Sequence, residues 1–198
     1  MSIRLGGIAA ITGAMILAVS WFGTIAGALP LDGRVLVALI LVGLVSLLVA
    51  LTILSAFQAR AMPGLVWTAF ALSAVGAIGY MVGMLGLIGV DEGAVSSGGI
   101  GEMIATVGYS VGGLAAVVGF ALFGIATYRS GVLSRPGAVL LAVGPALGAV
   151  AWVTALTVAW DLGGLLMLAA MACFLTGWVV LGVAAIRLDR PAAAANPA

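Results

Sequence analysis

The ten residues Tyr128–Gly137 read Y-R-S-G-V-L-S-R-P-G and separate two long apolar runs. They hold Arg129 and Arg135, two of the seven basic residues, together with the Ser, Gly and Pro residues typical of turns. Arginine in short loops gathers on the cytoplasmic side of a membrane protein. The stretch therefore predicts a cytoplasmic loop, and the orientation of every other segment follows from it.

The two apolar runs beside this loop belong to a set of six. The 198 residues are 65% hydrophobic and only 7% charged, whereas soluble domains carry about 25% charged residues. A helix of about 20 residues crosses the roughly 30 Å hydrocarbon core of a bilayer. The sequence therefore predicts an all-α bundle of six transmembrane helices in one domain, 1–187. The expected helices are 4–28, 35–57, 64–89, 102–128, 137–159 and 163–187.

The charges divide between alternate loops. Six of the seven arginines fall on one side of the expected bundle and five of the six acidic residues on the other. The positive-inside rule then predicts a multi-pass protein of the plasma (cell) membrane with both termini in the cytoplasm. The arginines expected to determine this topology are Arg60, Arg129, Arg135 and Arg187.

Both ends of the chain need separate interpretation. Arg4, the apolar run after it and Ala26-Gly27-Ala28 imitate a signal peptide. The uncharged run Leu5–Leu29 is longer than the usual apolar region of a signal peptide, about 7–15 residues, so we expect an uncleaved helix. The Pro- and Ala-rich tail 188–198 is predicted to be a disordered cytoplasmic segment.

Glycine is the most informative residue type inside the helices. The motif G-x-x-x-G lets a second helix approach closely, either within the bundle or from another subunit. The chain also shows a weak threefold pattern of hairpins, each with a basic start and an Asp-Gly type of turn; loop composition alone explains it as well. The G-x-x-x-G pairs begin at Gly23, Gly79, Gly108 and Gly144.

The residue inventory argues against most chemistry. There is no His, no Lys and a single cysteine, Cys173. The sequence therefore offers no nucleophile–base pair and no intramembrane ionisable group of the kind that ion-coupled transport uses. We expect no catalytic residue, no cofactor, no metal and no nucleic-acid partner. The tryptophans lie mostly near expected helix ends, as interfacial anchors do.

A ligand or packing site between the third and fourth helices is the best candidate that remains. It would use a carboxylate at the lip of the fourth helix, intramembrane hydroxyls, and a proline in the fifth helix that frees a carbonyl or kinks the helix. The candidate residues are Glu102, Tyr80, Tyr109, Ser110 and Pro145.

Two metal-site interpretations are weaker. The acids Asp32, Asp91, Glu92, Glu102 and Asp161 share one side and could attract Ca²⁺, but their spacing lacks a calcium-loop pattern. Several methionines and Cys173 fall in the same half of the bundle, and thioethers suit Cu(I). Methionine is also an ordinary flexible filler of apolar interiors.

The segment Gly124–Gly137 reads G-I-A-T-Y-R-S-G-V-L-S-R-P-G. It resembles a loop of the form Y-R-S-G-V-L-x-R found in small uncharacterised six-helix prokaryotic integral membrane proteins. It departs from their pattern at Ser134, where proline is usual, with Pro136 following two residues later. The resemblance implies a six-helix architecture and no particular activity.

These observations favour a non-enzymatic integral membrane protein. We expect an accessory or scaffold subunit that acts by helix packing with lipids, with further copies of itself or with a membrane-protein partner. The alternative is a small transporter or channel for a neutral or apolar substrate, with the glycine-rich helices and Pro145 as moving parts.

Overall fold

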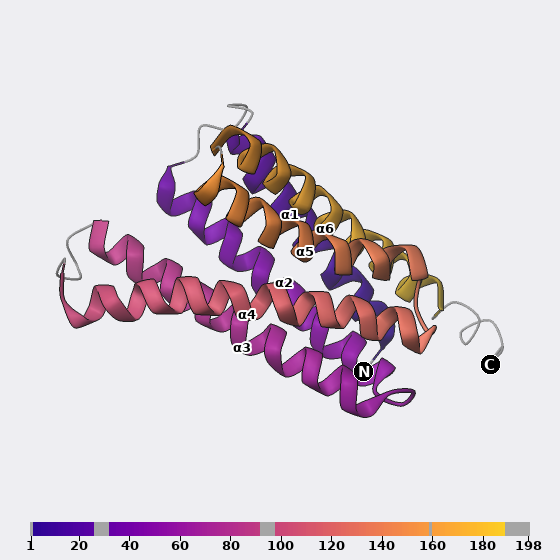
Figure 1. The fold of residues 1–198 in the computed structure, drawn as a ribbon. Helices are drawn as coiled ribbons and strands as arrows, with labels where there is room; N and C mark the ends of the chain where they lie inside the picture. The colour runs from indigo at the N-terminus through magenta and orange to yellow at the C-terminus, as the bar shows by residue number, and fades with distance from the viewer. Residues whose placement is uncertain (1, 26–31, 92–97, 159, 189–198) are drawn as a thin grey trace.

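The structure is a computed structural model that describes residues 2–25, 32–91, 98–158 and 160–188. These residues form α-helices and no strand, which confirms the all-α prediction for the described chain (Figure 1). The helices are α1 (Ile3–Ile25), α2 (Gly33–Gln58), α3 (Pro63–Asp91), α4 (Ile100–Ser130), α5 (Arg135–Thr157) and α6 (Trp160–Leu188).

All six helices are long and apolar enough to cross a membrane, as the sequence predicts. Each overlaps one expected range, and the ends differ by a few residues. Two features of the sequence lie outside the described residues. They are the Ala26-Gly27-Ala28 segment, which includes the second glycine of the Gly23 pair, and the tail beyond Leu188.

Local chemistry accounts for the shift in the start of α5. The helix α5 begins at Arg135 rather than at residue 137, because Ser134 acts as its N-cap and accepts a hydrogen bond from the Gly137 N–H at 3.4 Å. Before it, Gly131 ends α4 in the left-handed conformation at φ 63°, which glycine adopts without strain. The Arg129–Arg135 loop is thus a capped turn between two long helices.

The helices pack as three antiparallel hairpins. The closest neighbours are α3 with α4, α5 with α6 and α1 with α2; α1 also packs on α6 and α4 on α5, while α2 and α3 share few contacts. The start of α1 and the end of α6 lie at the same end of the bundle (Figure 1). We call it the arginine end, since it carries Arg4, Arg60, Arg129, Arg135 and Arg187, and the opposite end, with Asp32, Glu102 and Asp161, the acidic end.

Glycine contacts hold the hairpins together. A Cβ atom placed on Gly79 would lie 3.3 Å from the Gly112 Cα, and one placed on Gly108 would lie 3.3 Å from the Gly83 Cα. A Cβ on Gly144 would lie 2.7 Å from the Phe174 N in α6. The G-x-x-x-G pairs beginning at Gly79 and Gly108 and the first glycine of the Gly144 pair therefore serve packing inside the bundle.

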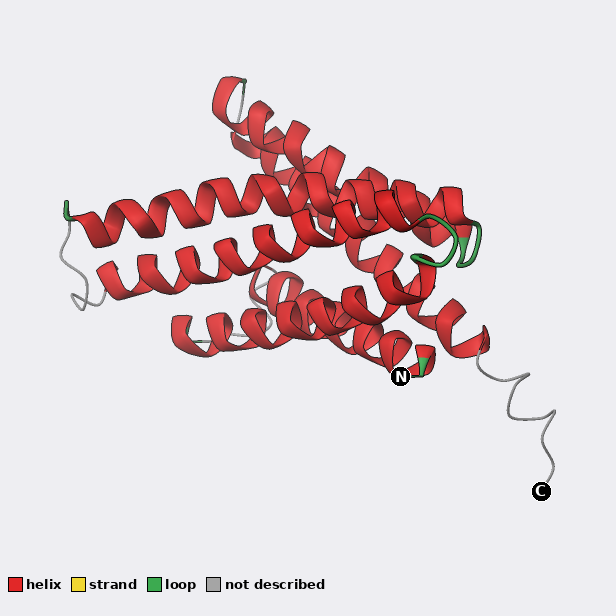
Figure 2. Ribbon diagram, turned by 90° about the horizontal axis from the view of Figure 1, so that it is seen from below, coloured by secondary structure: helices red, strands yellow, loops and turns green. Residues whose placement is uncertain are grey.

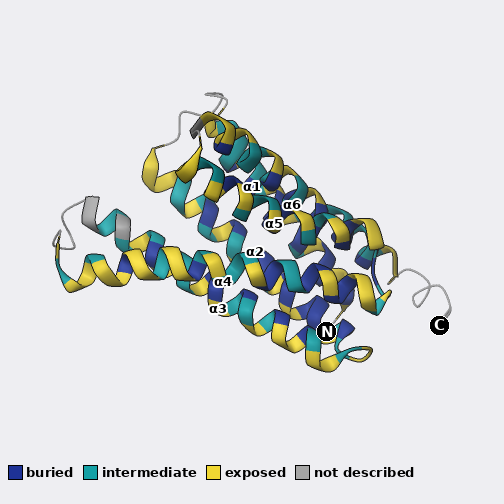
Figure 3. Cartoon of the chain, viewed as in Figure 1, coloured by how far each residue is buried: buried dark blue, intermediate teal, exposed yellow. Residues whose placement is uncertain are grey.

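The largest fully buried side chains concentrate toward the arginine end. They belong to the second halves of α2, α4 and α6 and to the first half of α5, and they form one apolar cluster (Figure 3). Toward the acidic end, the α3–α4 hairpin diverges from the other helices, and the separation is visible from two directions (Figures 1 and 2). The largest of these buried side chains include Leu47, Leu51, Leu54, Phe123, Leu141, Trp178 and Leu181.

Candidate functional site

The helices α4 and α5 touch near the arginine end and separate beyond it. A Cβ atom on Gly124 would lie 2.6 Å from the Ala142 N and 2.8 Å from the Ala138 carbonyl oxygen. Any larger residue at position 124 would push the α5 backbone away. This contact is the point from which the two helices diverge toward the acidic end.

The face of α4 that contacts α5 becomes steadily more exposed along the helix. From Gly124 it continues at helical spacing through Phe120, Val117, Gly113, Ser110 and Thr106. Gly124 and Phe120 are buried, Val117 and Gly113 are half-buried, and Ser110 and Thr106 are exposed. The same face therefore passes from a packed contact to an open surface.

The matching face of α5 follows the same gradient. It runs from Ala138 through Ala142, Pro145 and Ala149 to Trp152 and Leu156. Ala138 and Pro145 are buried, whereas Trp152 is 51% and Leu156 is 65% exposed. We call Thr106–Gly113 of α4 and Trp152–Leu156 of α5, the stretches along which these two faces become exposed, the α4–α5 interval.

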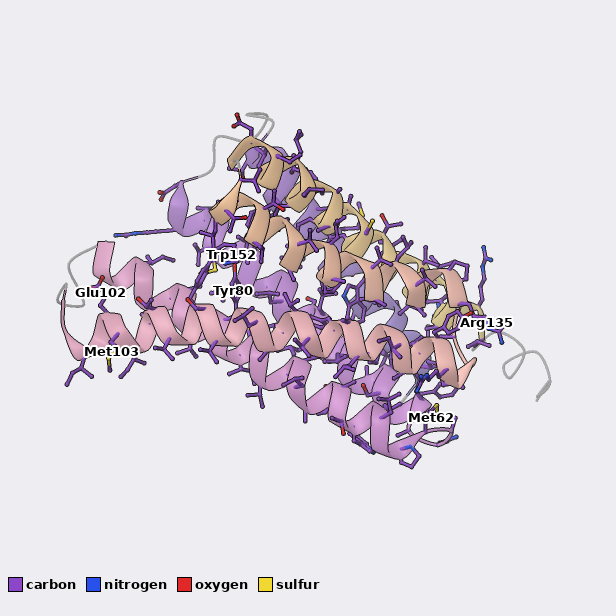
Figure 4. All side chains as sticks on the ribbon, viewed as in Figure 1. Met62, Tyr80, Glu102, Met103, Arg135 and Trp152 are labelled. Atoms are coloured by element: carbon purple, nitrogen blue, oxygen red, sulfur yellow. The ribbon has the colours of Figure 1, made fainter. Side chains whose placement is uncertain are left out.

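The two tyrosines predicted from the sequence lie beside this interval. The rings of Tyr80 and Tyr109 are 4.8 Å apart between centroids and tilted by 31°. A Cβ on Gly113 would lie 3.4 Å from the Tyr80 Cδ2, so the Tyr80 ring covers that glycine. Figure 4 labels Tyr80 on α3 and Trp152 on α5, which appear close together in this view. The rings of Tyr80 and Tyr109 thus lie beside the α4 face on which Ser110 and Thr106 are exposed, and Trp152 is exposed on α5.

The hydroxyl groups of this surface are not bonded to their own helix. Seven serines and threonines in these helices donate to the carbonyl four residues earlier, as Thr52 does to the Leu48 oxygen at 2.8 Å. In the described part of the chain Thr106 and Ser110 have no such bond, and the other exposed helical hydroxyls that lack one, Thr12 and Thr176, stand singly. Thr106 and Ser110 therefore present two free donors four residues apart.

Glu102 stands at the acidic end of the same α4 face, four residues before Thr106. Its carboxylate accepts a hydrogen bond from the Gly98 N–H, just before the helix starts. A carboxylate in the first turn also suits the helix dipole. The role that the contacts give Glu102 is to stabilise the start of α4.

Substitution of Glu102 tests this role. We expect Glu102→Ala to lower the free energy of unfolding by about 1 kcal/mol, the usual effect of losing a helix cap. Glu102→Gln keeps an acceptor oxygen and should change stability by less than about 0.5 kcal/mol. Unfolding in detergent with increasing dodecyl sulfate measures both. If Glu102→Ala and Glu102→Gln both lowered the free energy of unfolding by the same large amount, the carboxylate would have a buried partner instead.

Metal ligation finds little support among the residues described. They contain no group of three or more His, Cys, Asp or Glu side chains that could hold an ion. Met167 and Met171 do line one small pocket, of about 240 Å³, but its other walls are apolar and include Trp21 and Phe22. The thioethers there fill space between α1 and α6.

The interior holds polar groups that sequence reasoning missed. Among the described residues, five fully buried side chains have polar atoms without a hydrogen-bond partner. Gln58 was expected in a loop, but it is the last residue of α2 and is 0% exposed. The sequence offered one signal that Gln58 is special, because it is the single Gln of the chain. The five are Ser55, Gln58, Ser73, Thr127 and Trp178.

Comparisons with protein-family models, with curated proteins and with solved structures find no match to this chain. The resemblance of Gly124–Gly137 to six-helix prokaryotic membrane proteins therefore stays a prediction.

Proposed function

We propose that this chain is a non-enzymatic membrane protein that serves as an accessory or scaffold subunit. Its α4–α5 interval receives a transmembrane helix of a partner protein. The observation that carries the proposal is the pair of free hydroxyls, Thr106 and Ser110, on a helix face that has separated from its neighbour. We also propose that the protein lies in a prokaryotic cell membrane.

Helix association in lipid depends on close packing and interhelical hydrogen bonds, because lipid tails are as apolar as the side chains. The α4 side of the interval is narrow, with Gly113 and two small hydroxyl residues, so a partner backbone can come close. Trp152 and Leu156 supply bulk on the α5 side. A narrow polar strip facing a broad apolar one matches a helix better than it matches disordered acyl chains.

Native mass spectrometry of the protein, extracted gently at its natural abundance, tests the proposal. We expect a protein partner at fixed stoichiometry. The double substitution Thr106→Leu and Ser110→Leu should reduce its retention about tenfold, since it removes two donors and adds bulk. Val111→Leu is the matched control, because Val111 is exposed on α4 outside this face, and it should retain the partner fully.

Two results would contradict the partner proposal. Equal retention by the double variant and the control would remove the interval from the interface. A monomer or homo-oligomer with a bound neutral molecule would favour a small transporter instead. The aromatic rings of Tyr80, Tyr109 and Trp152 would then be the expected contacts of that molecule.

Orientation is a second part of the proposal. With five arginines at one end of the described helices, the positive-inside rule favours an arginine end that faces the cytoplasm, with both termini there. A fluorescent protein fused after Ala198 should be fluorescent, and alkaline phosphatase at the same position should be inactive. Replacing Arg129 and Arg135 while adding an arginine beside Asp91 should make the orientation mixed. Unchanged reporters in that variant would show that these arginines do not determine topology.

A further inference from the structure

A groove of about 550 Å³ opens at the arginine end, between α6 and the loop before α5. Val180, Val183, Ala184 and Arg187 form its α6 side at helical spacing, and the segment 132–134 forms the opposite wall. Gly137 packs against α6 at the base of the groove. A Cβ atom placed on Gly137 would lie within 3.1 Å of the Leu181 and Val180 side chains. This surface lies on the opposite end of the bundle from most of the α4–α5 interval.

The groove is polar at its rim and apolar along its length. Arg187 is exposed at the rim, and the Ser134 hydroxyl lies on the facing wall. Farther from the rim, the α6 wall consists of Val183, Ala184 and Val180. From Arg187 back to Val180 the helix rises about 10 Å, so a bound molecule would have a charged part at the bilayer surface and an apolar part beside the helix.

Among the described residues, the charged side chains at this end are all arginines. The acidic residues that the structure describes, Asp32, Asp91, Glu102 and Asp161, lie at the other end of the bundle. Arg135 follows Ser134 directly, and its guanidinium carbon stands 5.8 Å from the centre of the Tyr128 ring, over the ring face. The rim therefore offers an arginine beside a hydroxyl donor in an arginine-rich surface, which complements an anionic headgroup.

We propose that this groove binds one anionic phospholipid. The phosphodiester headgroup pairs with Arg187 and accepts from the Ser134 hydroxyl, and one acyl chain lies along Val183 and Val180. A guanidinium and a hydroxyl suit phosphate oxygens, and the apolar length of the groove selects a lipid over a free phosphate.

The test uses purified protein and dioleoylphosphatidylglycerol, with dioleoylphosphatidylcholine as the zwitterionic comparison. Native mass spectrometry should show one phosphatidylglycerol retained in excess phosphatidylcholine. We expect Arg187→Gln to weaken retention about five- to tenfold and Val183→Trp to abolish it by filling the groove. Arg60→Gln removes an exposed arginine at the same end but outside the groove, and should change retention less than about twofold.

Three outcomes would overturn the proposal. An equal loss in Arg60→Gln would mean that total charge, not the groove, holds the lipid. Equal retention of phosphatidylcholine would remove the preference for an anionic headgroup. Displacement by inorganic phosphate or glycerol phosphate at similar concentration would assign the site to a soluble anion. Circular dichroism checks that each variant is folded. If Val183→Trp is unfolded, Arg187→Gln alone tests the proposal.

Discussion

Replacing Gly83 with alanine is expected to force α3 away from α4 and to destabilise the protein by about 2–3 kcal/mol. A Cβ at Gly83 would overlap the Tyr109 backbone nitrogen and lie 2.6 Å from the Gly108 carbonyl carbon. Both atoms belong to the α4 backbone, so no side-chain rotation can make room. Overpacking of this kind typically costs about 1–3 kcal/mol, and a rigid neighbour places it at the upper end.

The matched control is Gly64→Ala, because Gly64 also lies in α3 but has nothing within 4 Å of the added methyl. Alanine favours helix by about 1 kcal/mol over glycine, so this variant should be as stable as the wild type or more so. Unfolding midpoints in dodecyl sulfate compare the two. Equal midpoints for Gly83→Ala and the wild type would contradict the close α3–α4 approach.

Trp178→Ala is expected to have the largest effect of a single side-chain truncation, about 3–5 kcal/mol. Trp178 is 0% exposed. Its ring stacks on Phe123 with centroids 5.7 Å apart and meets Phe120 and Phe174 edge-on at 6.1 and 6.3 Å. Separated helices remain in lipid, so the loss comes from the cavity and from dispersion contacts rather than from transfer to water.

Two further tryptophan variants make that prediction specific. Trp178→Phe keeps most of the ring volume and removes an indole N–H that has no partner among the described residues, so it should stay within about 1.5 kcal/mol of the wild type. Trp152→Ala removes a ring that is 51% exposed and should change stability by less than about 0.5 kcal/mol. A larger loss for Trp152→Ala than for Trp178→Ala would refute the packing described for the arginine half.

These two predictions concern the parts of the bundle that do not open. The aromatic cluster around Trp178 holds α4 and α6 together, and glycine contacts hold α3 against α4. The α3–α4 hairpin can therefore diverge at the acidic end while staying attached at the arginine end. This arrangement gives the α4–α5 interval two firm walls, which suits the docking of a partner helix.

The sequence by itself determined the class of the fold. Six uncharged apolar runs can satisfy their backbone groups in lipid only as helices or as a closed barrel, and their lengths match helices. The Ser-Gly and Arg-Pro-Gly turn at Tyr128–Gly137 marks a helix break by backbone chemistry alone, and the structure confirms that break. Each of these conclusions depends on neighbouring residues in the chain, so one sequence suffices.

Only the tertiary structure decided which helix faces meet. Nearly all positions in these helices are apolar, so hydrophobic periodicity does not distinguish buried faces from lipid-facing ones. The sequence could not show that Trp178 is an interior residue rather than an interfacial anchor, or that Gln58 is buried. It also could not show that Ser110 and Trp152 are exposed on faces that meet farther along their helices. Those facts depend on where backbones cross, and the crossings are fixed by glycine contacts between residues distant in the chain.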